Sequence, residues 1–246
     1  MRFENTEVFN IEGALRGMRN PLNSWAKSDS GYKRWCLSLG PDEEPHYCTN
    51  CHFDQCMMSD PEFVIGPNDM DLCRRLINGG PEHRKFLRQI FVSVDITAPL
   101  YWWKEFDTYK VGTTANSTST MHKLASTPIT LECFETDDYC GDLVYHELSL
   151  DQNELPLEYN ISDIAEDIVV TLERLRQKYL ETKDKRYWKE LVRWLPNGWL
   201  QTRTVTMNYE NLRTMYHQRK GHKLSEWKAF CEWVESLPYA KELIID

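Results

Sequence analysis

Two kinds of feature are missing from this 246-residue sequence. It has no run of eighteen apolar residues, and no apolar stretch of the kind found in signal peptides follows Met1. A membrane-spanning helix needs about 20 such residues, so we expect a cytoplasmic protein without a membrane partner. It also has no excess of positive charge, because its net charge is −9. General nucleic-acid binders need a basic face, so we expect no nucleic-acid partner, although a local pocket for one nucleotide remains compatible with this charge.

The common catalytic motifs are also absent. The sequence contains no Walker loop, no GxGxxG, no HExxH and no GxSxG. These absences exclude several enzyme classes. They leave enzymes in which a bound cofactor supplies the chemistry.

Cysteines are present, but their spacing is that of an incomplete zinc site. Cys48 and Cys51 form a CxxC pair, and Cys56 follows five residues later. A structural zinc site usually brings a second pair, whereas Cys36 and Cys73 are single and irregularly spaced. We therefore favour reduced cysteines in a loop insertion and predict no metal site. A zinc-stabilised interaction protein is the alternative.

The rest of the composition is that of an ordinary globular protein with an α+β pattern. A chain with 41% hydrophobic and 27% charged residues can bury a core without disulfides. Apolar alternation predicts a strand with Ile90, Val92, Val94 and Ile96 buried. The remaining expected elements are strands near 9–16, 128–133 and 199–207, and helices near 68–78, 100–107, 161–183, 184–195, 208–218 and 225–234. We expect residues 1–67 to form an irregular N-terminal region with the cysteine insertion, and residues 68–246 an α+β domain, in one compact unit.

Two cap assignments and two helical faces follow from the same patterns. Asn68 and Ser162 are the expected N-caps of the helices at 68–78 and 161–183. The helices at 161–183 and 184–195 read as a helical hairpin, with Leu172, Leu191 and Trp194 turned inward. Arg16 and Arg19 lie in a turn-rich stretch, where they could meet an anion or simply be solvated; solvation is the favoured interpretation.

The stretch from Pro99 to Leu124 is the first candidate for a ligand site. An aromatic helix-like segment leads into the hydroxyl-rich run from Thr113 to Thr120. A polar loop held by an aromatic scaffold is typical of a small-molecule site, and a surface loop after a buried helix is the alternative.

The C-terminal third carries a second candidate. Leu195-Pro196 precedes a strand, Asn208 stands where that strand meets a helix, and Arg219 closes the helix. An amide at such a junction can reach the edge of a ring. The guanidinium of Arg219 could recognise a pyrimidine carbonyl or a phosphate, or could only complement the negative end of its own helix.

In these spacings the sequence resembles the flavin-dependent thymidylate synthases. That family has LP, a strand, and then N-x-R-S-L-(five residues)-L-R, which matches Leu195-Pro196, Asn208, Leu212 and Arg219. The family signature RHRxxSxNExSxRY falls on Tyr109 to His122, with Thr114, Asn116 and Ser119 at the first serine, the asparagine and the second serine. Glu82-His83 before a strand is similar to a Glu-His pair of the family. The resemblance covers residues 68 to 233.

The resemblance implies a fold, an activity and an assembly. The implied fold is a twisted, mainly antiparallel sheet with flanking helices and a helical hairpin, assembled as a homotetramer. The implied activity is that of a flavoprotein methyltransferase of nucleotide biosynthesis: it converts dUMP to dTMP, with FAD as cofactor and NADPH and methylenetetrahydrofolate as co-substrates. A non-catalytic FAD- and nucleotide-binding relative is the alternative.

The resemblance also implies site residues. Arg219 is the implied catalytic group, polarising the uracil ring of the substrate. The implied cofactor-binding residues are Tyr109, Lys110, Val111, Gly112, Ser117, Asn208 and Thr214. The implied substrate-binding residues are Phe106, Thr114, Asn116, Ser119, Met121 and Arg219.

Several family arginines are replaced in this chain. The RHR triplet is Tyr109-Lys110-Val111, which leaves Lys110 as its only cation. Met121 stands for the later arginine and Glu210 for the arginine after Asn208. Because arginines hold phosphates through paired hydrogen bonds, these replacements should weaken anion binding more than they alter the fold.

Overall fold

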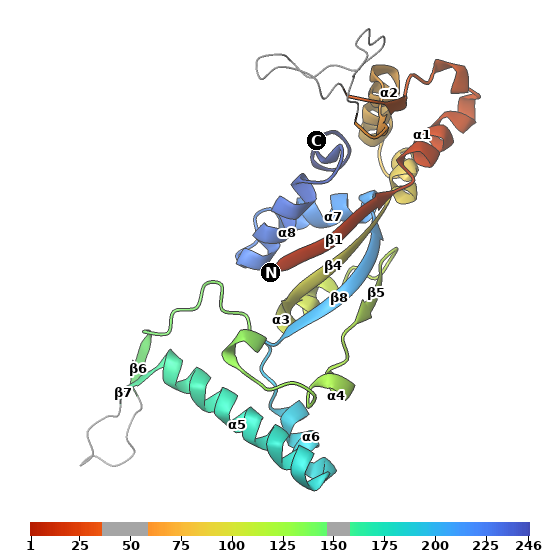
Figure 1. Ribbon diagram of the computed structural model, residues 1–246. Coiled ribbons are helices and arrows are strands. Elements are labelled where there is room, and N and C mark those ends of the chain that lie inside the picture. The colour runs from red at the N-terminus through yellow and green to blue at the C-terminus, as the bar shows by residue number, and fades with distance from the viewer. Residues whose placement is uncertain (36–58, 147–157) are drawn as a thin grey trace, which may run out of the picture. The chain divides into compact units, whose positions relative to one another are not determined.

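The structure is a computed structural model that describes residues 1–35, 59–146 and 158–246 (Figure 1). The chain forms two compact units, each assembled from segments distant in sequence. The first unit comprises residues 1–6, 93–206 and 223–230, and the second comprises residues 7–92, 207–222 and 231–246. The expected domain division after residue 67 stays a prediction. Within the described residues, every helix is too short or too polar to cross a bilayer.

A four-stranded sheet confirms the α+β class. Its strand order is β1 (Arg2–Phe9), β4 (Phe91–Pro99), β8 (Leu200–Asn208) and β5 (Thr114–Ser117) (Figure 1). β5 pairs with β8 in antiparallel fashion. The two long interior strands, β4 and β8, confirm the strand predicted from apolar alternation at residues 90–96 and the strand predicted near 199–207. The side chains of Ile90, Val92, Val94 and Ile96 are completely buried, as expected from that pattern.

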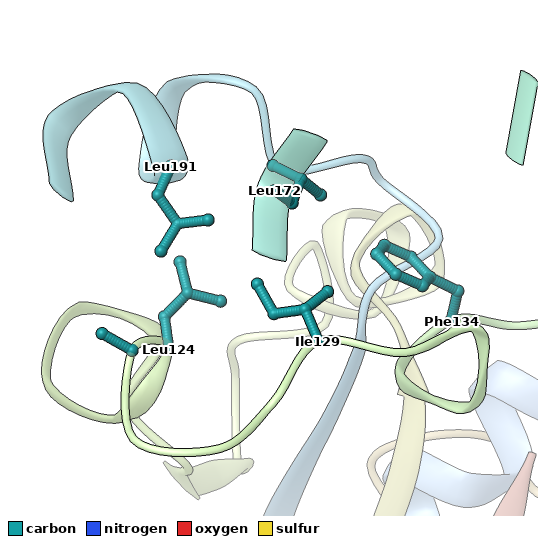
Figure 2. Close-up of a cluster of buried hydrophobic side chains, with 6 residues drawn as sticks. Leu124, Ile129, Phe134, Leu172 and Leu191 are labelled. Carbon is teal, nitrogen blue, oxygen red and sulfur yellow. The ribbon is translucent and has the colours of Figure 1, made fainter. Parts of the chain in front are cut away.

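The first unit contains the predicted helical hairpin. Helix α5 (Ile161–Thr182) packs against α6 (Lys185–Arg193), and Lys183 joins them in a left-handed conformation with φ of 56°. Six buried residues join the hairpin to the segment that precedes it, and Figure 2 shows their side chains facing one another. They are Leu124, Ala125, Ile129, Phe134, Leu172 and Leu191.

Three predictions for the first unit were wrong. The segment 128–133 forms a short 3₁₀ turn, η4 (Leu131–Cys133), because the N–H of Ile129 donates to Glu173 of α5 instead of to a strand. Helix α5 begins after Asn160 rather than Ser162, since the carboxylate of Asp163 accepts the N–H of Asn160. Trp194 is 66% exposed, because it lies past the last turn of α6, where its indole donates to Glu190.

The second unit begins with a helix where we had predicted a strand and turn. Helix α1 runs from Ile11 to Arg19, and Ala14, Leu15 and Met18 are buried along one face. That spacing is helical, and a short helix with few apolar residues is hard to recognise from periodicity alone. Asn10 makes the junction with β1 in a left-handed conformation with φ of 67°.

Helix α2 (Pro67–Asn78) has its N-cap two residues earlier than expected, at Gly66 rather than Asn68. Pro67 occupies the first helical position, where its missing N–H carries no penalty. Helix α7 (Tyr209–Arg219) has Asn208 as its N-cap, as predicted.

The other elements of the structure are η1 (Asn20–Leu22), η2 (Trp25–Lys27), β2 (Gly31–Lys33), β3 (Glu62–Val64), η3 (Arg84–Gln89), α3 (Leu100–Phe106), α4 (Thr120–Lys123), β6 (Val144–His146), β7 (Glu158–Asn160), α8 (Ser225–Glu235) and η5 (Lys241–Ile245).

Candidate functional site

Asn208 is held by the start of helix α7. Its Oδ1 accepts the N–H of Asn211 at 3.0 Å, and Oδ1 of Asn211 accepts the N–H of Asn208 at 3.2 Å. This reciprocal pair satisfies two of the N–H groups that every helix start leaves unpaired. Only 7% of Asn208 is exposed. The cap therefore fixes both the position and the orientation of this amide.

Glu210 on the first turn of α7 forms an ion pair with an arginine from a distant segment. Nε of Arg84, at the start of η3, lies 3.1 Å from Oε1 and 2.9 Å from Oε2 of Glu210. The two side chains are 20% and 14% exposed, so the pair is largely shielded from solvent. An arginine thus reaches the start of α7 in space, although the sequence there has glutamate where the family has arginine.

One face of α7 lines a hollow with a volume of about 320 Å³. Arg213, Thr214, His217 and Gln218 contribute to it from α7, and Arg84 contributes from η3. Thr214, His217 and Gln218 follow Arg213 by one, four and five residues. A single face of α7 therefore carries all four side chains. Three of the five lining residues are cationic or can become so.

Two of the basic groups of this hollow, on Arg213 and His217, contact one backbone carbonyl near the C-terminus. Nη1 of Arg213 donates to the carbonyl of Ile244 at 2.7 Å, and Nε2 of His217 lies 3.2 Å from the same oxygen. Burial lowers the pKa of Arg213, and the charge of Arg84 lowers it further. Burial also lowers the pKa of His217 below 6.5, and the charges of Arg213 and Lys220 act in the same direction. The hollow therefore concentrates positive charge, which a bound anion would relieve.

Arg219 lies at the last position of α7, where its charge complements the negative end of the helix dipole. It is partly buried and does not line the hollow. Thr214 does line it, and its hydroxyl also donates to the carbonyl of Glu210 at 3.0 Å. Of the residues implied by the resemblance, the second unit therefore contains Asn208, Thr214 and Arg219, all at or on α7.

In the first unit, the hydroxyl-rich stretch forms an edge strand. Thr114, Asn116 and Ser117 pair with Thr206, Thr204 and Arg203 of β8, and all four residues of β5 are exposed. A polar edge strand with short side chains keeps its backbone paired on one side only. The hydroxyls and amide of β5 therefore face solvent, where a ligand can reach them.

Ser119 and Met121 follow this strand at helix α4. Ser119 is the N-cap, with its Oγ accepting the N–H of His122 at 3.1 Å. Met121 is 50% exposed, and its carbonyl accepts the indole N–H of Trp188 at 3.3 Å. Both residues are accessible in part, next to the end of β5.

The residues before β5 divide into a buried and an exposed group. Phe106 is only 3% exposed and stacks on Trp102 with ring centroids 5.0 Å apart, so its ring is part of the aromatic core. Tyr109 meets Trp227 edge to face at 6.2 Å. Lys110, Val111 and Gly112 are exposed, with Val111 at 88% and Gly112 in a turn with φ of 78°.

A cation that we had not predicted lies opposite the edge strand. Arg203 of β8 is paired with Ser117, and its guanidinium lies 4.1 Å from the ring centroid of Trp103. Its Nη1 donates to Asp107 at 2.7 Å, which neutralises part of its charge. The alternation of Gln201, Arg203 and Val205 along the strand was visible in the sequence, but the packing of Arg203 on an aromatic ring was not.

Helix α7 belongs to the second compact unit and strand β5 to the first. Arg84, Arg213, His217 and Gln218 are the members of the α7 hollow that sequence reasoning missed. Extending the helical face from Thr214 by one turn would have found His217 and Gln218. Arg84 could not be found in this way, since its place depends on the tertiary fold.

Metal ligands do not gather in the part of the chain that the structure describes. No group of three histidine, cysteine, aspartate or glutamate side chains there has the geometry of a metal site. Cys36, Cys48, Cys51 and Cys56 lie outside the described residues. The zinc alternative therefore stays a prediction.

Comparison with known proteins gives a match in structure and none in sequence. The chain matches no protein-family model and no curated protein. Among solved structures it is similar to the flavin-dependent thymidylate synthase ThyX from Helicobacter pylori complexed with FAD and dUMP, with a TM-score of 0.59 and 14% identity over 99% of this chain and 98% of that one. A second structure of the Helicobacter pylori enzyme with FAD and dUMP gives a TM-score of 0.60 and 16% identity over 99% and 97% of the two chains. The chain therefore has the fold of the flavin-dependent thymidylate synthase ThyX.

Proposed function

We propose that this protein binds FAD and a pyrimidine nucleotide and that its activity is the conversion of dUMP to dTMP. The observation that carries the proposal is the cationic hollow on α7 in a chain of the ThyX fold. Arg213, the first residue of α7 that lines this hollow, follows the N-cap residue Asn208 by five positions. The structural neighbours are complexes with FAD and dUMP. NADPH and methylenetetrahydrofolate are the co-substrates that this reaction requires.

The residues of the α7 hollow fit a phosphate-bearing group. Arg84 and Arg213 supply guanidinium N–H donors, and Thr214 adds a hydroxyl. Guanidinium groups pair with phosphate oxygens through two parallel hydrogen bonds. A volume of about 320 Å³ is at the lower end of the range for ligand pockets, so it suits a phosphate with part of its sugar rather than a whole dinucleotide.

Each group of residues has a proposed role in binding. When bound, FAD supplies the electron and one-carbon transfer chemistry of the reaction, so the protein needs no nucleophile of its own. Asn208 and Thr214 would hold the cofactor, and Arg219 would polarise the uracil ring of the substrate. The exposed side chains of Thr114 and Asn116 would hydrogen-bond the nucleotide, together with Ser119, and that of Ser117 would contact the cofactor.

The remaining implied residues act through their backbone or their position. Phe106 would shape the substrate side of the site from the aromatic core. Tyr109, Lys110, Val111 and Gly112 would contact the cofactor, with Lys110 as the only cation among them. Met121 would border the substrate. A homotetramer is part of the proposal, because sites of this fold are expected to combine segments from several protomers.

An absorption spectrum of the purified protein and a tritium-release assay on dUMP test the proposal in sequence. We expect a flavin spectrum after incubation with FAD, and tritium release that depends on NADPH and methylenetetrahydrofolate. Arg84→Gln should lower FAD occupancy, whereas Arg88→Gln should not, because the exposed Arg88 lies on the same 3₁₀ helix but outside the hollow. A protein that takes up no FAD would contradict the proposal.

A non-catalytic FAD- and nucleotide-binding protein is the second candidate. The observation that favours it is the Arg84–Glu210 ion pair, since Glu210 neutralises a cation that would otherwise act on a ligand. Complementation of a thymidine-requiring strain separates the two candidates. Growth without thymidine supports the enzyme, and FAD binding without growth or tritium release supports the binding protein.

A further inference from the structure

Two adjoining hollows lie beside helix α1 in the second unit, and no residue of the proposed function lines them. Their volumes are about 410 Å³ and 240 Å³. Glu12, Arg16, Tyr32 and Phe63 line both, so the two hollows share one wall. The larger is in the size range of small-molecule sites.

Aromatic side chains form much of this wall and remain accessible. Tyr32 of β2 is 65% exposed and meets Phe63 of β3 edge to face, with ring centroids 5.4 Å apart. Trp25 lines the smaller hollow and is 50% exposed, and its indole N–H donates to Oδ1 of Asn20 at 2.9 Å. Exposed rings that are held in place offer flat contact area at a low cost in conformational entropy.

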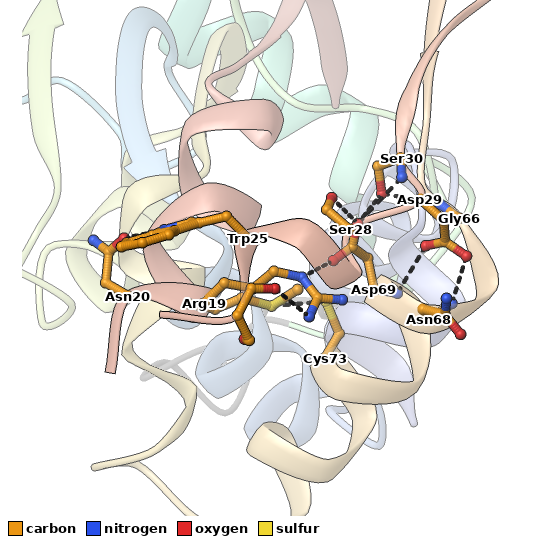
Figure 3. A network of polar contacts seen from close by, with 12 residues as sticks. Arg19, Asn20, Trp25, Ser28, Asp29, Ser30, Gly66, Asn68, Asp69 and Cys73 are labelled. Carbon is orange, nitrogen blue, oxygen red and sulfur yellow. Dashed lines mark hydrogen bonds and ion pairs between the residues drawn. The ribbon is translucent and has the colours of Figure 1, made fainter. Parts of the chain in front are cut away.

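A buried arginine supplies the polar end of the smaller hollow. Arg19 is 4% exposed, and Figure 3 shows its guanidinium beside Asp69 of α2. Its Nε donates to Oδ1 of Asp69 at 2.5 Å, and its Nη1 donates to the carbonyl of Ser24 at 3.3 Å. Nη2 of Arg19 makes no hydrogen bond to another described residue, although Arg19 lines the hollow. Nη2 is not one of the described buried polar atoms that lack a partner, so it reaches solvent and is available to donate to a group that enters the hollow.

The partners of Asp69 keep its carboxylate ionised, and the carboxylate holds Arg19 in place. Asp69 is completely buried, and its Oδ2 accepts hydrogen bonds from Ser28 Oγ at 2.6 Å and Ser30 Oγ at 2.5 Å (Figure 3). Burial alone would raise the pKa of Asp69, but the hydrogen bonds from Ser28, Ser30 and Arg19 hold it below its usual value. Asp69 therefore neutralises Arg19, and the exposed Arg16, three residues earlier on α1, adds a second cation to the same wall.

We propose that these hollows bind a small molecule with a planar heteroaromatic ring and an anionic group, which is the chemistry of a nucleoside 5′-phosphate. Nη2 of Arg19 and the guanidinium of Arg16 face the anion, and Tyr32, Phe63 and Trp25 face the ring. Glu12, whose carboxylate lies 3.4 Å from the hydroxyl of Tyr32, accepts a ring N–H. This α1 site is distinct from the α7 hollow and from β5, and it does not depend on the proposed function.

Calorimetric titration of the full chain tests the α1 site with four probes: 5′-AMP, 5′-UMP, adenosine and inorganic phosphate. We expect at least one of the two nucleotides to bind and to quench tryptophan fluorescence through Trp25. Adenosine and phosphate should each bind at least about tenfold more weakly, because each makes only part of the contacts. Absence of binding by both nucleotides overturns the proposal. So does phosphate binding as tight as that of either nucleotide in the Arg84→Gln variant, in which the α7 hollow is damaged.

Substitutions locate the binding and separate it from the proposed function. Arg16→Gln and Tyr32→Ala alter exposed side chains, so the fold should persist while affinity falls about tenfold. Arg75→Gln is the control, because Arg75 is an exposed arginine of α2 that lines neither hollow. Nucleotide binding should be retained in the Arg84→Gln variant, in which the α7 hollow is damaged. Loss of binding in Arg84→Gln, or unchanged affinity in both Arg16→Gln and Tyr32→Ala, assigns the nucleotide elsewhere and overturns the proposal.

Discussion

The polar residues of α7 and those of β5 differ in how firmly the protein holds them. At α7, Asn208 is fixed by a capping pair and Arg213 by the carbonyl of Ile244, and Glu210 of α7 fixes Arg84 of η3. On β5, the side chains of Thr114, Asn116 and Ser117 are exposed and make no hydrogen bond to another described residue. Both segments carry residues of the proposed function, yet only one of them is organised before a ligand arrives.

This difference predicts how each segment contributes to binding. Ordering a free side chain on binding costs about 0.5–1.5 kcal/mol, whereas a side chain that is already fixed avoids that cost. Substitutions on α7 should therefore change both stability and affinity, and substitutions on β5 should change affinity alone. Measurements on the two segments can sharpen or break this contrast.

The largest effect is expected for Arg84→Gln. The substitution leaves the carboxylate of Glu210 largely buried without its cation, so the free energy of unfolding should fall by about 2 kcal/mol. Urea denaturation of Arg84→Gln beside the control Arg88→Gln measures it. Equal stability of the two variants would show that the ion pair is as dispensable as an exposed one.

The matched substitution Glu210→Gln tests the same pair from its other side. It leaves Arg84 in the hollow without its counter-charge, so affinity for inorganic phosphate should rise by several-fold. Calorimetric titration with phosphate measures it against the unaltered chain. A fall in affinity would mean that Glu210 positions Arg84 more than it neutralises it.

Asn208→Ala comes next, because it removes the cap of α7. Loss of an N-cap side chain costs about 1 kcal/mol of stability. Asn208→Asp keeps an acceptor for the N–H of Asn211 but lacks the Nδ2 donor. Its free energy of unfolding should therefore be close to that of the unaltered chain, whereas its affinity for FAD should be lower. Equal FAD affinity for Asn208→Asp and the unaltered chain would restrict Asn208 to its role as a cap.

The sequence predicted α7 well because the signals there are local. An asparagine between a strand of alternating residues and an apolar helical stripe marks a helix start, and the structure places the cap at Asn208. The buried face of β4 and the helical hairpin were predicted for the same reason. Each depends on the periodicity of a single continuous segment.

The parts that escaped prediction depend on contacts between distant segments. Arg84 reaches Glu210 across 126 residues, and Arg19 reaches Asp69 across 50. The sequence pattern of one segment does not predict which distant residue that segment contacts. The segment at 128–133 was mistaken for a strand since its apolar residues pack on α5, where Glu173 takes the N–H of Ile129 that a strand would need.

Protonation of His217 should change the free energy of unfolding by less than the substitutions at Arg84 and Asn208 do. Burial, Arg213 and Lys220 lower its pKa in the folded protein below the value of 6.5 for a free histidine. Protonation is thus harder in the folded than in the unfolded chain. The contribution of His217 to stability is present above pH 6.5 and is lost as the pH falls through its folded pKa.

Two measurements check this prediction. The imidazole signal of His217 in NMR spectra should titrate with a midpoint below 6.5. Phosphate should raise that midpoint if it binds in the α7 hollow, because an anion favours the imidazolium. His217→Gln should flatten the pH dependence of stability below pH 6.5, and a midpoint above 6.5 would mean that an acidic group outweighs Arg213.

The smallest effect on stability is expected on β5. Asn116→Ala and Ser117→Ala each remove an exposed side chain that holds nothing in place, so the free energy of unfolding should change by less than about 0.5 kcal/mol. Affinity should nevertheless fall by several-fold, for dUMP in Asn116→Ala and for FAD in Ser117→Ala, since each substitution removes a donor or acceptor from its proposed ligand contact. The partner strand offers a control in Thr206→Ala, an exposed residue of β8 opposite Thr114. If Asn116→Ala binds dUMP and Ser117→Ala binds FAD as tightly as the Thr206→Ala control does, β5 is a solvated edge and the ligand contacts belong to α7 alone.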